Sequence, residues 1–184
     1  MAKFDNWRSP VAHLSEGFPS SLTELPFTHQ INLRGDITDK AFKTAVKKAT
    51  GLVLPVIPNE VGMGKDNIKA LWLSPNEWLI VSDHEITDIR DSLAEIHSAA
   101  TDVSANRIIL GLSGPDALEV LMKSCEMDLD PNVFKTGQVV QTLIAKSQAI
   151  IEKVSDDTYH IYVRNSFAAY VCEWLVDAHV EYRM

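Results

Sequence analysis

The pattern of apolar and polar residues along the chain predicts two successive rounds of strands and helices. In the first round, residues 29–34 alternate polar and apolar side chains, as a half-buried strand does. A helix is expected at 39–50, where apolar residues recur at helical spacing and lysines face outward. Strands at 69–74 and 77–82 and a helix at 86–98 complete this round.

The second round repeats this order. It begins with a strand at 103–112, and Ser113 is then expected to cap a helix that buries Leu118 and Leu121. The remaining elements are three strands and a final helix, at 138–145, 148–154, 158–164 and 166–179.

The final helix is apolar over most of its circumference. One stripe is expected to face the core and consists of Phe167, Tyr170, Val171, Trp174, Leu175 and Ala178. A second apolar stripe consists of Ala168, Ala169, Cys172 and Val176. Because a helix that is apolar all round is usually buried on two sides, we expect this second stripe to meet a partner.

The two rounds also resemble each other in amino-acid sequence, with residues of similar type at corresponding positions. Residues 70–81 align with 151–163, which places Trp78 on Tyr159 and Ile80 on Ile161. This repetition predicts an α+β fold of duplicated strand-helix-strand-strand-helix units, with helices on one face of each sheet. We expect a single domain at 28–184, made of pseudo-repeats at 28–99 and 101–182.

Residues 1–27 differ from the rest, because three prolines interrupt any helical or strand period. An extended arm that contributes no core element is therefore expected. The arm carries four aromatic side chains, more than a solvated tail needs: Phe4, Trp7, Phe18 and Phe27. It either lies across its own domain or docks on another subunit, and the sequence favours neither alternative.

Composition narrows the class of partner. The chain has 184 residues, of which 46% are hydrophobic, and its formal net charge is −8. This is ordinary globular composition, and the acidic balance disfavours nucleic acid or an anionic membrane surface as a partner. There is no apolar run long enough to cross a bilayer and no signal peptide in the first residues, so a cytoplasmic protein is expected.

Motifs that could carry chemistry are incomplete. The stretch Gly62-Met63-Gly64-Lys65 is followed by Asp66 where a phosphate loop needs Ser or Thr, which leaves a glycine-rich surface loop. Around Ser113, a nucleophile elbow would need glycine where Pro115 stands. Two cysteines, Cys125 and Cys172, are expected to be buried and inert.

Three other groups of polar residues are interpreted as structural. The histidines lack metal-ligand spacing; they are His13, His29, His84, His97, His160 and His179. Asp128 and Asp130 suit a turn opener as well as a carboxylate pair. The stretch 101–107 is either a hydrogen-bonded turn, with Asp102 paired to Arg107, or a ligand contact. No catalytic, cofactor-binding or metal-binding residue is assigned.

Several longer strings together resemble the gamma subunit of bacterial heterotetrameric sarcosine oxidase, over nearly the whole chain from Glu24 to Tyr182. The strings are ELPFTHQINLRGD (24–36), ALWLSPNEWLIV (70–81), TDVSANRIILGLSGPDALEVL (101–121), CEMDLDPNVFKTG (125–137), QTLIAKSQAIIEK (141–153) and VRNSFAAYVCEWLVDAHVEY (163–182). The resemblance implies the duplicated fold of aminomethyltransferase folate-binding domains, in agreement with the internal repeat.

The resemblance also implies a role. The complex oxidatively demethylates sarcosine to glycine with hydrogen peroxide and formaldehyde or methylene-tetrahydrofolate as further products. FAD, FMN, NAD, tetrahydrofolate and zinc are implied on the alpha, beta and delta subunits, with none on this chain. We therefore expect a structural adaptor without activity of its own, packed on the folate-binding domain of alpha.

Two other functions are compatible with the sequence. One is a free-standing folate-binding protein or one-carbon transferase, with residues 57–67 or 101–107 as ligand contacts. The other is a gamma-like subunit of a related demethylase that acts on another N-methylated amine. In that second case the choice of substrate would belong to the beta partner, so this chain does not distinguish the two complexes.

Overall fold

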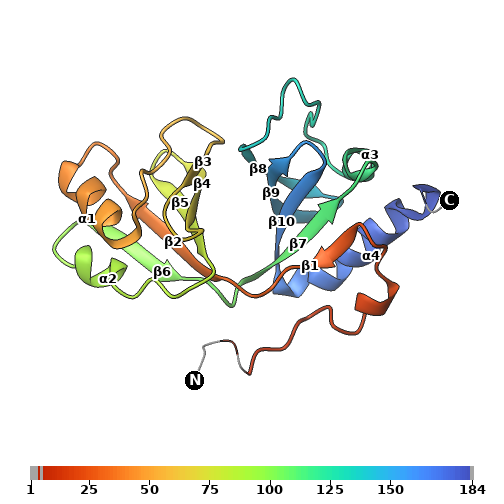
Figure 1. Ribbon diagram of the computed structural model, residues 1–184, viewed down its shortest axis with the longest axis horizontal. Helices are drawn as coiled ribbons and strands as arrows, with labels where there is room; N and C mark the ends of the chain where they lie inside the picture. The colour runs from red at the N-terminus through yellow and green to blue at the C-terminus, as the bar shows by residue number, and fades with distance from the viewer. Residues whose placement is uncertain (1–3, 5, 183–184) are drawn as a thin grey trace. The chain divides into compact units, whose positions relative to one another are not determined.

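The computed structural model describes residue 4 and residues 6–182, and its contacts divide the chain into two units. The middle unit is formed by Thr28–Ser104, and the terminal unit by Met1–Phe27 together with Ala105–Met184. Each unit contains one five-stranded antiparallel sheet with its helices on one face (Figure 1). The predicted α+β class with duplicated units is confirmed.

In the middle unit, the strands in sheet order are β3 (Val61–Met63), β4 (Lys69–Ser74), β5 (Glu77–Ser82), β2 (His29–Gly35) and β6 (Ser98–Asp102). Its helices are α1 (Lys40–Thr50) and α2 (Ile89–Ser92). The carboxylate of Asp39 caps α1 by accepting a hydrogen bond from the Ala41 N–H at 2.7 Å. The helix ends at Gly51, which adopts the left-handed conformation with φ 69°, as the sequence predicts.

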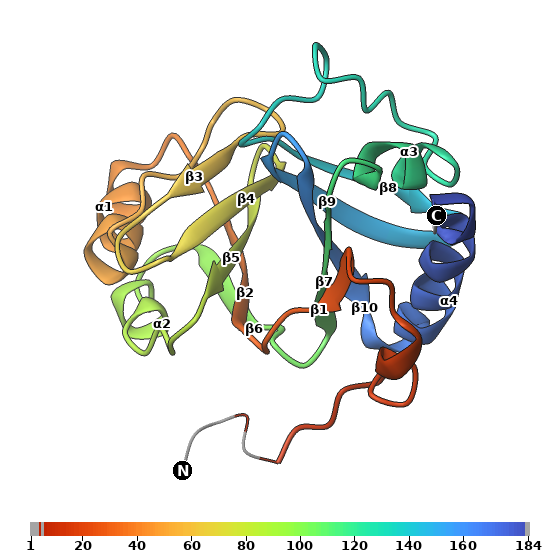
Figure 2. The same cartoon turned by 45° about the vertical axis from the view of Figure 1, so that its right-hand side comes forward.

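In the terminal unit, the strands in sheet order are β1 (Leu22–Glu24), β7 (Arg107–Ser113), β10 (Thr158–Arg164), β9 (Ser147–Ser155) and β8 (Val139–Ile144). Its α-helices are α3 (Ala117–Met122) and α4 (Ala168–Ala178), which lie on the same face of this sheet (Figure 2). Single 3-10 turns lie at Ser15–Gly17, Asn165–Phe167 and Val180–Tyr182.

The two units are related by an exchange of their edge strands. In chain order, β1 comes directly before β2, and β6 comes directly before β7. Yet β1 pairs with β7 in the terminal sheet, and β6 pairs with β2 in the middle sheet. Each unit is therefore completed by the strand that leads into the other one, and the chain crosses between the units at 27/28 and again at 104/105.

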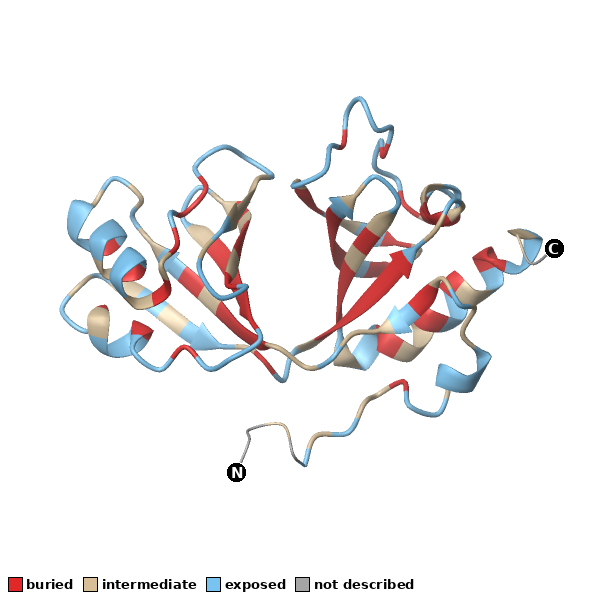
Figure 3. Ribbon diagram, in the orientation of Figure 1, coloured by how far each residue is buried: buried red, intermediate tan, exposed pale blue. Residues whose placement is uncertain are grey.

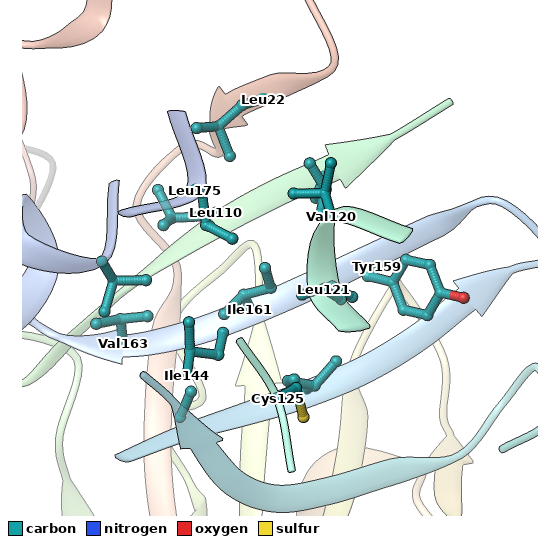
Figure 4. Packing of buried hydrophobic residues seen from close by; sticks show 14 of the residues in the cluster. Leu22, Leu110, Val120, Leu121, Cys125, Ile144, Tyr159, Ile161, Val163 and Leu175 are labelled. Atoms are coloured by element: carbon teal, nitrogen blue, oxygen red, sulfur yellow. The ribbon is translucent and has the colours of Figure 1, made fainter. Parts of the chain in front are cut away.

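Each sheet packs one face against its own helices. Along the strands, buried and more exposed residues alternate in places, as expected when successive side chains point to opposite faces (Figure 3). The core of the terminal unit joins strands, α3 and α4 through Leu110, Val120, Leu121, Ile161 and Leu175 (Figure 4). The middle unit has a separate core around Phe42 and Trp78, whose rings lie 6.1 Å apart.

The structure corrects the predicted helix at 86–98. The helix expected at 86–98 is reduced to α2, because the chain continues from Asp91 in 3-10-type turns with Ala94 and Ile96 bonded to carbonyls three residues back. Residues 98–102 instead form β6, whose pairing with β2 overrides the local helical spacing. Residues 52–57 form no strand, and the short strand β3 forms at 61–63.

The N-terminal arm contributes to the core of the terminal unit, so the expectation that it contributes no core element is wrong. Val11 and Leu22 are both buried in that core. The rings of Phe4, Trp7 and Phe27 pack together, with centroids between 4.8 and 6.1 Å apart. The described part of the arm thus lies on its own unit. The division into an arm and two repeats of one domain stays a prediction.

The orientation of α4 also differs from the prediction. Its buried face consists of Ala168, Val171, Cys172, Leu175 and Ala178. Phe167 and Trp174, which were expected in the core, are 46% and 42% exposed. The small side chains of Ala168 and Cys172 face the sheet, and large aromatic rings at the same positions would keep the helix away from it. The second apolar stripe of the helix, which we expected to meet a partner, therefore contributes Ala168 and Cys172 to the core.

Gly35 provides a test of how closely the middle core is packed. A Cβ atom at this position would lie 2.4 Å from the ring of Phe42, whose side chain is fully buried. We expect Gly35→Ala to lower the free energy of unfolding by about 1–3 kcal/mol, because the ring has to move within a filled core. Urea unfolding followed by circular dichroism measures this change.

Gly17→Ala is the matched control for that substitution, since nothing lies within 4 Å of the added carbon there. Its free energy of unfolding should stay within about 0.5 kcal/mol of the wild type. Equal stability of the two variants would contradict the close packing described at Gly35.

Both cysteines are free and buried, as predicted. Burial raises the pKa of the Cys172 thiol to about 12, with smaller contributions from Glu24 and Glu173. Because the thiolate is the reactive form, we expect Cys172 in a Cys125→Ser variant to resist alkylation by iodoacetamide at pH 8. Mass spectrometry should show rapid labelling only after unfolding in urea, and rapid labelling of the folded chain would refute the assignment.

Candidate subunit interface

The glycine-rich stretch at 62–65 is a packing feature of the middle unit. Gly62 lies in β3, and a Cβ there would meet the Pro55 side chain at 2.9 Å. At Gly64 an added Cβ would lie 2.8 Å from the Leu52 side chain. The glycines thus let β3 approach the loop that follows α1, as expected for a structural loop.

Ser113 does not cap a helix, contrary to the prediction. It is the last residue of β7, and its backbone N–H donates to the Ser21 carbonyl at 2.8 Å. The chain then turns at Gly114, where φ is 108°, and α3 begins three residues later with Asp116 before it. No side-chain hydrogen bond caps this helix.

The histidines occupy separate places. His179 ends α4, and its Nε2 lies 2.9 Å from the Ser21 hydroxyl. His97 lies beyond α2, directly before β6. Among the described residues, no group of three or more His, Cys, Asp or Glu side chains could hold a metal ion.

The polar stretch at 101–107 contains a hydrogen-bonded turn. The Asp102 carboxylate accepts from the Ser104 N–H at 2.9 Å and from its hydroxyl at 2.6 Å. The buried Ser104 hydroxyl in turn accepts from the Gln30 N–H at 3.0 Å. Asp128 and Asp130 each accept a hydrogen bond from the backbone N–H two residues further on, as turn openers do.

One apolar surface lies on the outer side of α4. It consists of Phe167, Tyr170 and Trp174, and we call it the aromatic stripe. The rings of Tyr170 and Trp174 lie 6.0 Å apart, and the Trp174 indole N–H donates to the Ser124 hydroxyl. This bond places Trp174 beside the end of α3, where Met122 is 59% exposed. Trp174 is therefore held in position while its ring stays 42% exposed.

A second apolar surface lies on the middle unit. Between α1 and β4, four large apolar side chains are between 57% and 68% exposed, and we call them the apolar loop: Val53, Val56, Ile57 and Met63. The loop is anchored, because the Trp78 indole N–H donates to the Pro55 carbonyl at 2.9 Å. In addition, the Trp72 N–H donates to the Glu60 carbonyl at 3.1 Å.

Sequence reasoning did not single out these apolar side chains as a surface. Pro55 and Pro58 indicate a loop, since proline cannot donate to a sheet. The spacing of the apolar residues does not show that Val53, Val56 and Ile57 are exposed. Large exposed apolar surfaces of this kind mark sites of protein–protein contact. None of the described helices is long and apolar enough to span a membrane.

Comparison with known proteins shows the family to which the chain belongs. The model of the sarcosine oxidase gamma subunit family matches residues 34–181. The sarcosine oxidase subunit gamma of Corynebacterium sp. (strain U-96) is 31% identical over 187 residues, covering 95% of this chain and 91% of the relative. The sarcosine oxidase subunit gamma of Arthrobacter sp. is 30% identical over 185 residues, with the same coverage.

Solved structures agree with this placement. A chain of the heterotetrameric sarcosine oxidase from Corynebacterium sp. U-96, in complex with pyrrole 2-carboxylate, matches with a TM-score of 0.90 at 31% identity over 97% of each chain. The glycine cleavage system aminomethyltransferase T from Bartonella henselae matches with a TM-score of 0.61 at 15% identity, over 84% of this chain and 45% of that one, and shows the fold alone. This chain therefore belongs to the sarcosine oxidase gamma subunit family.

Proposed function

We propose that this chain is the gamma subunit of a heterotetrameric sarcosine oxidase and serves as a docking subunit. Family membership and the match to a chain of such a complex support the assignment. The reaction of the complex is the oxidative demethylation of sarcosine to glycine in the cytoplasm. We assign FAD, FMN, NAD, tetrahydrofolate and zinc to the alpha, beta and delta subunits.

The observation that carries the docking role is the aromatic stripe. Tyrosine and tryptophan are enriched among the residues that contribute most to binding between proteins, because they bury a large area at a small entropic cost. In the stripe, Trp174 is already held by the Ser124 hydroxyl, so little further ordering is needed on association. Covering the stripe would remove its apolar area from water without rearranging α4.

We propose the folate-binding domain of the alpha subunit as the partner of the aromatic stripe. The fold shared with aminomethyltransferase T supports this choice, because it relates the gamma chain to the same class of domain. The apolar loop is proposed as a second contact within the same complex.

A charge placed on the aromatic stripe should weaken assembly. We expect Phe167→Glu to raise the dissociation constant of gamma from the other subunits about thirtyfold, because a carboxylate is desolvated where a ring would be buried. The measurement is the amount of gamma retained on a tagged alpha subunit after co-expression with beta and delta. Sarcosine-dependent peroxide formation by the retained complex is measured alongside.

Ser166→Glu is the matched control for this substitution. Ser166 is the exposed neighbour of Phe167 and receives the same added charge. The control should assemble like the wild type, and both variants should unfold at the wild-type temperature. Equal retention of the two variants would exclude the stripe as an interface, and unfolding of Phe167→Glu alone would show that the ring is part of the core.

The apolar loop has its own test. We expect Ile57→Asp to reduce retention about tenfold, whereas Asn59→Asp adds the same charge to the same exposed loop and should leave retention unchanged. Aspartate tolerates the positive φ of 66° that Asn59 adopts. If both variants lose assembly equally, the effect comes from charge on the loop and its apolar side chains are not the contact.

A further inference from the structure

The helix α1 carries four lysines and no acidic residue. All four are exposed, and we call them the lysine face: Lys40, Lys43, Lys47 and Lys48 (Figure 3). The first three recur at helical spacing on the side opposite the buried Phe42 and Val46. This concentration of positive charge occurs in a chain whose net charge is −8.

The lysine face is not neutralised within the chain. None of its ammonium groups forms an ion pair with a carboxylate of the described residues. Two acidic residues precede α1, and both are held by hydrogen bonds at the start of the helix. Asp36 accepts from the Thr38 N–H at 2.8 Å, and Asp39 accepts from the Ala41 N–H at 2.7 Å.

Two of the lysines lie where the helix itself does not favour them. Lys40 is the first helical residue and Lys43 follows three residues later, so both lie near the positive end of the helix dipole. Acidic residues are preferred there, and α2 and α3 each have one in their first turn. Lys47 and Lys48 lie in the last turn, where a cation is stabilising. Helix stability therefore explains only the second pair.

An open hollow of about 450 Å³ lies beside the lysine face. Two of its lysines, Lys40 and Lys48, line the hollow and are about two helical turns apart. The other lining residues are small or polar and come from both helices: Ala41, Thr44, Ala45 and Ser92. In the described part of the chain no carboxylate lines it. Small side chains allow the backbone of a partner to approach between the charges.

The lysine face continues into the apolar loop. The helix ends at Gly51, where a Cβ atom would lie 3.2 Å from the Lys65 side chain. The exposed Lys65 thus lies beside the end of α1, and it follows Met63 of the apolar loop by two residues. Apolar side chains bordered by charged ones are the usual arrangement of a contact between proteins.

We propose that the lysine face docks a carboxylate-rich segment of another subunit. This inference rests on the proposed function, because it adds a contact within the same complex. A short acidic segment meets the lysines directly, whereas carboxylates of this chain beyond about 8 Å are screened at physiological salt. An extended polyanion such as nucleic acid would meet the repulsion of the whole acidic chain. Charges of this kind speed and orient association more than they tighten it.

The test is the rate at which full-length gamma associates with an immobilised alpha–beta–delta complex. Biolayer interferometry measures it at about 50 and about 500 mM NaCl. We expect the double variant Lys40→Glu, Lys43→Glu to associate about tenfold more slowly than the wild type at low salt and equally fast at high salt, with unchanged dissociation. Because carboxylates suit the start of a helix, this variant should be at least as stable as the wild type.

The matched control is the double variant Lys135→Glu, Lys146→Glu. Both lysines are exposed in loops of the terminal unit, and the control adds the same charge to the chain. It should associate as the wild type does at both salt concentrations. The variant Lys40→Arg, Lys43→Arg keeps the positive charge and should keep the fast association.

Four results would overturn the inference. Equal association of the charge-reversed variant and its control at low salt would do so while leaving the proposed function in place. Slow association of that variant at high salt as well would show an effect other than charge. Absence of binding by wild-type gamma would overturn the proposed function too. Competition by duplex DNA, without competition by poly-L-glutamate, would assign the lysine face to nucleic acid.

Discussion

The structure depends on the pairing of one inner strand of each sheet, β7 or β2, with the strand that precedes the other unit in the chain. Hydrogen bonds from Leu25 N–H to the Ile109 carbonyl and from Ser113 N–H to the Ser21 carbonyl fasten β1 along β7. On the other sheet, β6 covers β2 and continues in the Val103 N–H bond to the Gln30 carbonyl at 2.8 Å. Without these pairings, β7 and β2 would be unpaired sheet edges, which proteins rarely leave open. The core formed with α3 and α4 requires β7 in its place, because β7 contributes Leu110 to it.

This chain exposes two apolar surfaces that are held in place by hydrogen bonds. Large apolar groups are exposed on α4 and on the loop between α1 and β4, yet hydrogen bonds from Trp174 and Trp78 hold both regions in place. Exposed apolar groups that are already ordered lose little entropy when they are covered, which is the property expected of a permanent subunit contact. Membership of the sarcosine oxidase gamma subunit family indicates the type of complex in which such contacts would form.

The sequence predicts the strands and the longer helices well, because alternation and helical spacing are local signals. Both α1 and the pair β4–β5 lie where the pattern places them. The pattern fails where a distant partner decides the outcome, as in β6, which has polar ends and forms only on β2. Because α4 is apolar over most of its circumference, the spacing of Phe167 and Trp174 could not reveal which face meets the sheet. Arg107 and Arg164 are likewise far apart in the chain and become neighbours only through strand register.

Because the edge strands are exchanged, the two units complete their sheets at different times during synthesis. β6 follows α2 directly, so the middle unit has all of its strands as soon as that segment has left the ribosome. β1 is synthesised first, but its partner β7 emerges only after the whole middle unit, and the rest of that sheet emerges later still. Throughout this interval the aromatic N-terminal segment has no sheet to join. Pairing of β1 with β7 is also slow, because the whole middle unit separates the two strands in the chain. The nascent chain therefore exposes its aromatic N-terminal segment for longest, and this is the stage at which a chaperone would protect it.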